Sequence, residues 1–121
     1  TYAGADFTFD GCTFNSNVGK FVNAYKEQKS DITPLTFIDC TFNATTADKA
    51  AVCLKSQAAQ EWNLSFKNCK VDSCKADGDS KDLTTGSKYY SVRSSDNGNV
   101  CPAATTVTID GVVAWANGQV Q

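Results

Sequence analysis

Hydrophobic and polar residues alternate in four similar segments of the chain, at residues 7–14, 35–42, 64–71 and 107–114. Each segment has an alternating stretch, a two-residue corner and a second alternating stretch. Because strand side chains point to opposite faces in turn, each segment is expected to form a strand, a bend and a second strand. Such self-similarity is the signature of a repeat architecture, in which successive copies stack on one another.

The second corner residue is always of a type that tolerates a left-handed backbone or bonds to its own main chain. It is Gly11, Asp39, Asn68 or Gly111 in the four copies. The corner keeps the inward-facing residues of both strands of a copy on the same side of the chain. Stacked copies then form internal columns of these residues. Each fully buried large side chain in a column stabilises the fold by roughly 1.5–3 kcal/mol. The expected columns are Phe7/Leu35/Leu64/Val107, Phe9/Phe37/Phe66/Ile109, Cys12/Cys40/Cys69/Val112 and Phe14/Phe42/Val71/Ala114, with Thr8/Thr36/Ser65/Thr108 facing outward.

The segments between the copies also have strand character, because they are rich in β-branched and aromatic residues. They are Phe21–Tyr25, Ala51–Leu54 and Tyr89–Val92. The whole pattern, apolar-x-apolar-x-Asn/Asp/Gly-Cys-x-Phe, resembles the coils of right-handed parallel β-helices, the fold of pectate-lyase-like enzymes, phage tail proteins and many surface adhesins. The resemblance implies an all-β, short right-handed parallel β-helix or solenoid of about four coils, as a single domain over residues 1–121 with an excursion loop at about 76–106.

A leucine-rich repeat is the competing solenoid. Residues 32–42 also match its spacing of aliphatic positions, and residues 47–61 could supply its helix. The other copies, however, place Gly4, Glu61 and Ala104 where Ile32 stands, and none of these is a large aliphatic residue. We therefore favour the β-helix.

The cysteines indicate an oxidising compartment and a disulfide-stabilised fold. Equivalent residues on adjacent coils lie ~4.8 Å apart, within the range that a disulfide bridges. Six thiols allow 15 pairings, and a column of three cannot close on itself, so the connectivity stays open. Reduced thiols in a cytosolic protein are the alternative, while zinc is disfavoured because the chain has no histidine and no C-x2-C pair. The candidates are Cys12, Cys40, Cys53, Cys69, Cys74 and Cys101.

Charge and hydropathy narrow the possible partners. Lysine and arginine number 11 against 13 aspartates and glutamates, and no block of basic residues occurs, so nucleic acid is not an expected partner. No apolar run is long enough to span a bilayer. The chain begins at Thr1, has no methionine and shows no signal peptide, so we expect a mature secreted or surface protein that has lost its leader, or a piece of a longer one.

The excursion at 76–106 is where chemistry would sit, since long loops often carry binding residues. Asp77, Asp79 and Asp82 could bind calcium, but the loop lacks the glycine and the closing glutamate of a calcium loop, so a solvated turn is favoured and no cofactor is expected. Without histidine, nucleophilic triads and histidine bases are excluded. A β-helix polysaccharide lyase would need acidic calcium ligands with an Arg or Lys base, for which the spacing singles out no candidate. The nearby residues are Asp72, Asp77, Asp79, Lys75 and Arg93.

Two other features point to partners. The aromatic rings could stack on sugars, although such residues more often pack at coil edges; the candidate binding residues are Trp62, Tyr89, Tyr90, Arg93 and Trp115. Only six or seven residues lie beyond the repeat at each end, and neither tail is typical of a capping helix. The sequence therefore predicts a non-enzymatic structural subunit of an extracellular or virion surface assembly that stacks through uncapped ends, which other copies or neighbouring domains of a larger assembly would cover. A glycan-binding adhesion module and a β-helix polysaccharide lyase-like enzyme are the alternatives.

Overall fold

The computed structural model describes residues 6–17, 21–24, 32–46, 48–54, 61–77, 82–83, 85–93, 95–96, 99–100 and 104–121. These ranges contain strands and no helix, which confirms the all-β prediction. The strands are β1 Phe7–Asp10, β2 Thr13–Ser16, β3 Val22–Ala24, β4 Thr33–Ile38, β5 Thr41–Ala44, β6 Val52–Leu54, β7 Trp62–Lys67, β8 Lys70–Asp72, β9 Asp82–Leu83, β10 Tyr90–Arg93, β11 Ser95–Asp96, β12 Asn99–Val100, β13 Thr106–Ile109, β14 Val112–Ala116 and β15 Gln119–Val120.

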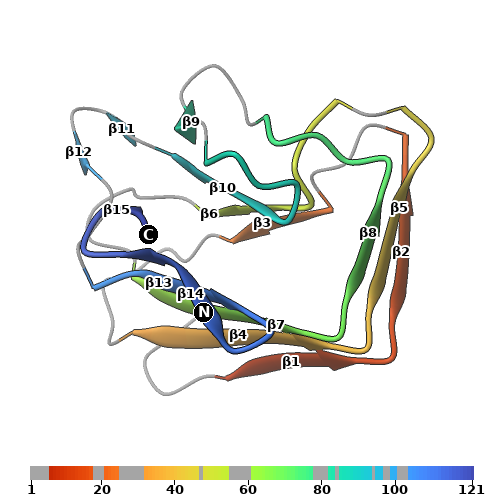
Figure 1. Cartoon of the computed structure of the whole chain (residues 1–121), viewed down its shortest axis with the longest axis horizontal. Coiled ribbons are helices and arrows are strands. Elements are labelled where there is room, and N and C mark those ends of the chain that lie inside the picture. The colour runs from red at the N-terminus through yellow and green to blue at the C-terminus, as the bar shows by residue number, and fades with distance from the viewer. Residues whose placement is uncertain are drawn as a thin grey trace.

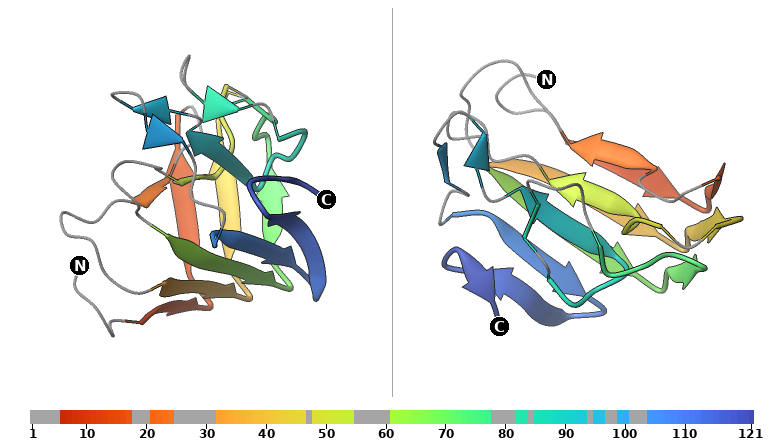
Figure 2. Two further views of the ribbon diagram at one scale, coloured as in Figure 1. Left: turned by 90° about the vertical axis from the view of Figure 1, so that its left-hand side faces the viewer. Right: turned by 90° about the horizontal axis from the view of Figure 1, so that it is seen from above.

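Three parallel stacks of strands lie on three sides of a common interior (Figure 1). Sheet A contains β1, β4, β7 and β13, sheet B contains β2, β5 and β8, and sheet C contains β3, β6 and β10. The chain thus makes three passes, β1–β2–β3, then β4–β5–β6, then β7–β8–β10, each visiting the three sheets in order. Figure 2 shows the passes as successive layers from the N-terminal to the C-terminal side.

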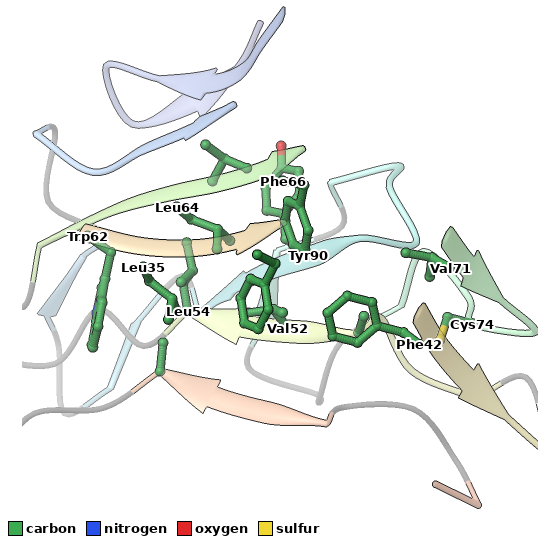
Figure 3. Packing of buried hydrophobic residues seen from close by; sticks show 14 of the residues in the cluster. Leu35, Phe42, Val52, Leu54, Trp62, Leu64, Phe66, Val71, Cys74 and Tyr90 are labelled. Atoms are coloured by element: carbon green, nitrogen blue, oxygen red, sulfur yellow. The ribbon is translucent and has the colours of Figure 1, made fainter. Parts of the chain in front are cut away.

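The registers confirm the predicted columns wherever the chain runs parallel. Phe9 lies beside Phe37, Phe37 beside Phe66, and Phe66 beside Ile109. The ring centroids of Phe9 and Phe37 are 5.2 Å apart and those of Phe37 and Phe66 are 5.5 Å apart, both stacked. In-register stacking of identical side chains builds a continuous dry interior, which the core residues of Figure 3 fill.

The corners depend on single residues in the left-handed region. Gly11, Asp39 and Asn68 have φ values of 69°, 52° and 52°. Two of these corner side chains also bond between passes, because Asn68 Nδ2 donates to Asp39 Oδ1 at 2.7 Å. The prediction of a left-handed corner residue is confirmed at these positions. The bend directs both Phe9 and Phe14 into the interior, where their ring centroids are 5.8 Å apart.

The fourth copy does not turn the corner, which corrects two of the predicted columns. Val112 lies opposite Ile109 in an antiparallel pair, and its side chain is 70% exposed. Asp110 and Gly111 both have positive φ, 48° and 81°, the conformation of a two-residue hairpin turn. Strand β14 therefore folds back along β13 and β15 folds back along β14, so Val112 and Ala114 do not extend the columns of Cys12 and Phe14.

The segments between the copies form strands as predicted, and this excludes the leucine-rich alternative. Strand β6 occupies the region where that fold needs a helix, and Ile32 is 44% exposed instead of buried. The excursion at 76–106 is not all loop, because it contains β9 to β12, and β10 continues sheet C.

The expected disulfides are not found in the part of the chain that the structure describes. Cys12, Cys40, Cys69 and Cys74 carry free thiols, Cys53 is buried, and Cys101 lies outside the described residues. The column cysteines point their thiols at main-chain carbonyls. Cys40 Sγ, for example, donates to the carbonyl oxygens of Phe9 and Ile38, both at 3.3 Å.

Candidate functional site

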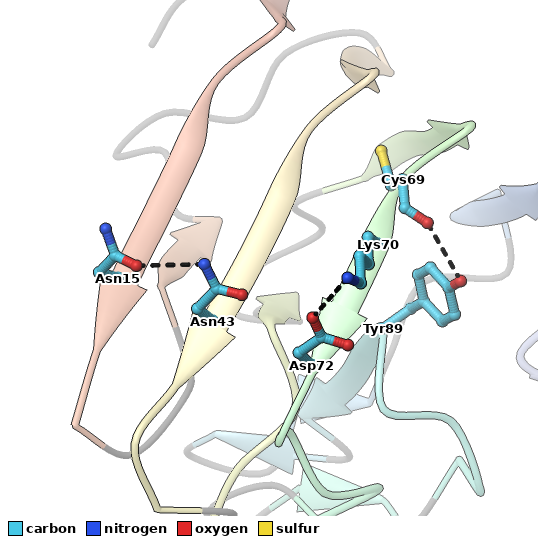
Figure 4. A network of polar contacts seen from close by, with 6 residues as sticks. All are labelled: Asn15, Asn43, Cys69, Lys70, Asp72 and Tyr89. Carbon is cyan, nitrogen blue, oxygen red and sulfur yellow. Dashed lines mark hydrogen bonds and ion pairs between the residues drawn. The ribbon is translucent and has the colours of Figure 1, made fainter.

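Most of the predicted sugar-stacking residues belong to the core. Trp62, Tyr90 and Trp115 are 3%, 1% and 1% exposed, so their ring faces pack against the interior and are not available to a sugar. Tyr89 is half-buried, and its hydroxyl donates to the Cys69 carbonyl at 3.5 Å (Figure 4). Arg93 lies in β10, and its side chain is outside the described part of the structure.

The predicted calcium residues are not brought together by the described part of the chain. Asp77 is exposed, Asp79 lies outside the described residues, and only the backbone of Asp82 is described, opposite Arg93. Within the described ranges no three metal-ligating side chains gather. Asp72, a candidate for lyase chemistry, instead pairs with Lys70 at 3.3 Å (Figure 4).

The first pass forms an open edge on three sides of the molecule. Among the described strands, β1, β2 and β3 each pair on one side only, with β4, β5 and β6 respectively. We call these three outermost strands the first-pass edge. An edge strand of this kind can hydrogen-bond to a further strand. Such pairing can lead to aggregation, and it is also a way in which proteins bind partners.

Aromatic side chains fill the interior behind this edge but are only half covered. Phe9 and Phe14 are half-buried, whereas their equivalents one pass later, Phe37 and Phe42, are fully buried at 0% exposure. Phe21 extends the cluster, with its ring centroid 6.4 Å from that of Phe14. One further layer of strands would bury the first-pass rings as the first pass buries those of the second.

Antiparallel strands close the opposite end of the molecule in sheets A and C. In sheet A, the antiparallel strands β14 and β15, which we call the C-terminal cap, follow the last parallel strand. In sheet C, β9 pairs antiparallel with β10. Sheet B ends at the three-residue β8, whose Lys70 side chain is 72% exposed. Charged, short and antiparallel edge strands are the devices that prevent further pairing.

The first-pass edge has few charged residues, although β3 is as short as β8 and β1 contains Asp10. Strands β2 and β3 contain no charged residue. The charged residues of the described segment 6–17 are two exposed aspartates, Asp6 and Asp10. The two ends therefore differ in chemistry as well as in topology.

Buried thiols and phenols are held in their neutral forms. Burial raises the pKa of the Cys69 and Cys74 thiols above the ordinary value, and burial likewise raises the pKa of Tyr89 and takes that of Tyr90 to about 12. Because nucleophilic chemistry needs the thiolate, these cysteines are suited to packing and not to catalysis at neutral pH.

Sequence reasoning missed the closed end, although a signal was present. Asp110-Gly111 and Asn117-Gly118 are both hairpin-turn dipeptides, separated by five residues, and Asn117 and Gly118 have φ values of 55° and 75°.

Comparison with known proteins found no matching family model, no matching curated protein and no matching solved structure. Among the described residues, no helix has the length and apolar character needed to cross a bilayer. The functional interpretation therefore depends on the geometry of the chain itself.

Proposed function

We propose that this domain is a structural assembly module, a short right-handed parallel β-helix that docks through its first-pass edge as a subunit of an extracellular or particle-surface structure. The in-register parallel pairs of the three sheets support the β-helix assignment. The observation that carries the function is the asymmetry of the ends among the described residues. A half-covered aromatic layer at one end faces no described strand, whereas antiparallel strands follow the parallel strands of sheets A and C at the other.

Energetics favour docking over an isolated open edge. Phe7, Phe9 and Phe14 are each half-buried, and burying further apolar surface contributes roughly 25 cal/mol per Å². A partner that adds strands to the edge would cover these rings and extend the backbone hydrogen bonding of the sheets in one step.

Sugar binding and lyase chemistry have less support. The rings proposed for sugar stacking at Trp62, Tyr90 and Trp115 are buried. The free thiols of the described cysteines do not by themselves indicate an oxidising compartment, so the proposed surface location depends on the resemblance of the repeat.

Light scattering coupled to size exclusion, with electron microscopy of the same fractions, tests the proposal. We expect the wild-type protein to form discrete oligomers as its concentration rises, and Phe14→Asp to dissociate them by placing a carboxylate within the docking layer. Val112→Asp is the matched control, because Val112 is 70% exposed in the C-terminal cap and its replacement should leave assembly unchanged. Circular dichroism verifies that both variants fold. A wild-type protein that stays monodisperse and monomeric at the highest concentration would overturn the proposal.

A further inference from the structure

We propose that the stacked cysteines Cys12, Cys40 and Cys69 form a redox modification site. When a disulfide oxidant reacts with the reduced chain, Cys40 forms a disulfide with one of its two neighbours, Cys12 or Cys69. Because Cys40 is the central member, the column holds one disulfide at a time. The inference does not depend on the proposed function, since it concerns how the passes stack and not what the first-pass edge binds.

Main-chain hydrogen bonds place these cysteines side by side on successive passes. Thr41 N donates to the Cys12 carbonyl at 2.9 Å, and Lys70 N donates in the same way to the Cys40 carbonyl at 2.9 Å. In-register neighbours in a sheet lie about 4.8 Å apart, and a disulfide joins Cα atoms roughly 4.4–6.8 Å apart. Cys40 is therefore within reach of both neighbours, whereas Cys12 and Cys69 are two passes apart and too distant to bond to each other.

The thiols of the column already lean along the stack. Cys40 Sγ donates to the Phe9 carbonyl of the first pass at 3.3 Å. Cys69 Sγ donates to the Phe37 carbonyl of the second pass at 3.3 Å. Each of these thiols thus points from its own pass toward the pass before it, which contains the preceding cysteine. Bond formation then requires rotation of two side chains and no shift of the strand register.

Access differs along the column and sets the order of the steps. Cys40 is 1% exposed, whereas Cys12 and Cys69 are half-buried. An outer cysteine therefore meets the oxidant first, and Cys40 acts as the resolving thiol, a neighbour that redox-sensitive cysteines often have. Burial raises the pKa of the Cys69 thiol, and the charge of Cys40 adds to the rise, so Cys69 should react faster in mildly alkaline solution than at neutral pH.

The reaction balances with an organic disulfide, RSSR, as the oxidant. The thiolate of an outer cysteine attacks one sulfur of RSSR, which breaks the S–S bond, forms a mixed disulfide and releases RS⁻. The Cys40 thiolate then attacks the protein sulfur of the mixed disulfide, and a second RS⁻ leaves. Two protein thiols thereby lose two electrons, RSSR gains them, and the two protons of the protein thiols end on the released RS⁻ to give two RSH.

The remaining outer thiol can move the disulfide along the column. Its thiolate attacks Cys40 Sγ, forms a new S–S bond and releases the other outer cysteine, a step that needs no further oxidant. Stacking places the three sulfurs in a row, which is the in-line arrangement that attack on a disulfide requires. The oxidised protein should therefore contain both linkages, Cys12–Cys40 and Cys40–Cys69.

Oxidation of the folded, fully reduced chain with hydroxyethyl disulfide, followed by alkylation in denaturant and tryptic mapping, tests the inference. Lysines divide the sequence so that Cys12, Cys40, Cys69 and Cys74 fall in separate tryptic peptides. We expect the column to lose two thiols per chain, every linked pair of its peptides to contain Cys40, and no Cys12–Cys69 link to form. The oxidised protein should unfold at a higher denaturant concentration, because the disulfide closes a loop in the unfolded chain.

Single replacements identify the role of each cysteine. Cys40→Ser should abolish the linkage and leave the outer cysteines as mixed disulfides, because the resolving thiol is missing. Cys12→Ser and Cys69→Ser should each still form one disulfide, because the other outer cysteine remains. Cys74→Ser is the matched control, since Cys74 is a buried cysteine outside the column and its replacement should leave the oxidation unchanged. Circular dichroism verifies that each variant folds.

Three results would overturn the inference. They are column thiols that survive an excess of the oxidant in the folded wild-type protein, a Cys12–Cys69 link, and a column disulfide that forms in folded Cys40→Ser. The first two come from the wild-type chain, so they decide the matter even where a variant fails to fold. None of the three bears on the proposed assembly function, which the oligomeric state of the reduced chain tests.

Discussion

Tyr90 on β10 donates its hydroxyl to the main-chain carbonyl of Ala114 on β14 at 3.2 Å. The contact joins sheet C to the C-terminal cap of sheet A across the interior, and Tyr90 is 1% exposed (Figure 3). The pair therefore links the third pass to the strand that closes its end.

Replacing Tyr90 by phenylalanine should lower the free energy of unfolding by about 1 kcal/mol, because the change removes one buried hydrogen bond while keeping the ring. Urea titration measures the loss. Tyr89→Phe is the matched control, since the Tyr89 hydroxyl is only half-buried and contacts the Cys69 carbonyl at 3.5 Å, so a smaller loss is expected. Equal losses in the two variants would contradict a special role for the Tyr90 contact.

Alkaline pH should weaken the fold through the same phenol. Burial raises the pKa of Tyr90 to about 12, above the ordinary value of 10.0, so the folded state keeps a proton that the unfolded chain releases. The contribution is fully present below pH ~10 and is lost as pH rises toward ~12, a total of about 2–3 kcal/mol. Urea titrations of wild type and Tyr90→Phe across this pH range isolate the contribution of the Tyr90 hydroxyl. If the stabilities of the two proteins fell in parallel with pH, the loss could not be assigned to Tyr90.

The hairpin that begins the cap should be sensitive to a side chain at Gly111. Its φ is 81°, where a residue with a Cβ is strained, although no atom lies within 4 Å of the Cβ position. We expect Gly111→Ala to cost about 1–2 kcal/mol in stability. Gly111→Asn should cost less, because asparagine tolerates the left-handed region. Thermal unfolding compares the two, and an equal cost would contradict backbone strain as the cause.

The sequence predicted the parallel part of the fold in detail because its signals are local and repeated. The alternation of Phe7 and Phe9 fixes which face of the strand is buried, and one left-handed residue at Gly11, Asp39 or Asn68 fixes the bend. Since copies with the same pattern stack in register, the columns followed from the repeat itself.

The closed end and the cysteines could not be derived in the same way. The pair Asp-Gly occurs at both 10–11 and 110–111, yet only the second has two residues with positive φ and forms a hairpin. The choice depends on what lies beyond the strand, which a local pattern does not encode. Stacked cysteines also suggested disulfides, but a thiol in this column can donate to a carbonyl, as Cys40 does.

The loss of stability on replacing a phenylalanine by alanine should depend on how deeply its ring is buried in the aromatic stack. Phe37 is 0% exposed between Phe9 and Phe66, and we expect Phe37→Ala to cost about 3–5 kcal/mol of stability. Phe9→Ala should cost clearly less in the dilute monomer, because Phe9 is half-buried at the first-pass edge. Denaturant titration at low concentration measures both, and similar losses would mean that the first-pass edge is already covered within one chain.

The free thiols make a prediction that separates this fold from a disulfide-stabilised one. Thiol titration in denaturant without reductant should find at least four reactive groups per chain, from Cys12, Cys40, Cys69 and Cys74. In the native protein Cys40 should resist alkylation, because it is 1% exposed, and Cys69 and Cys74 should react slowly at neutral pH, because burial raises the pKa of both thiols.

Mass mapping of the alkylated peptides assigns each site, and a reducing agent should leave the midpoint of thermal unfolding unchanged. Fewer than four thiols, or a midpoint that falls on reduction, would mean that disulfides join these cysteines in the protein as isolated. The column of Cys12, Cys40 and Cys69 would then act as a covalent staple instead of a row of thiols bonded to carbonyls.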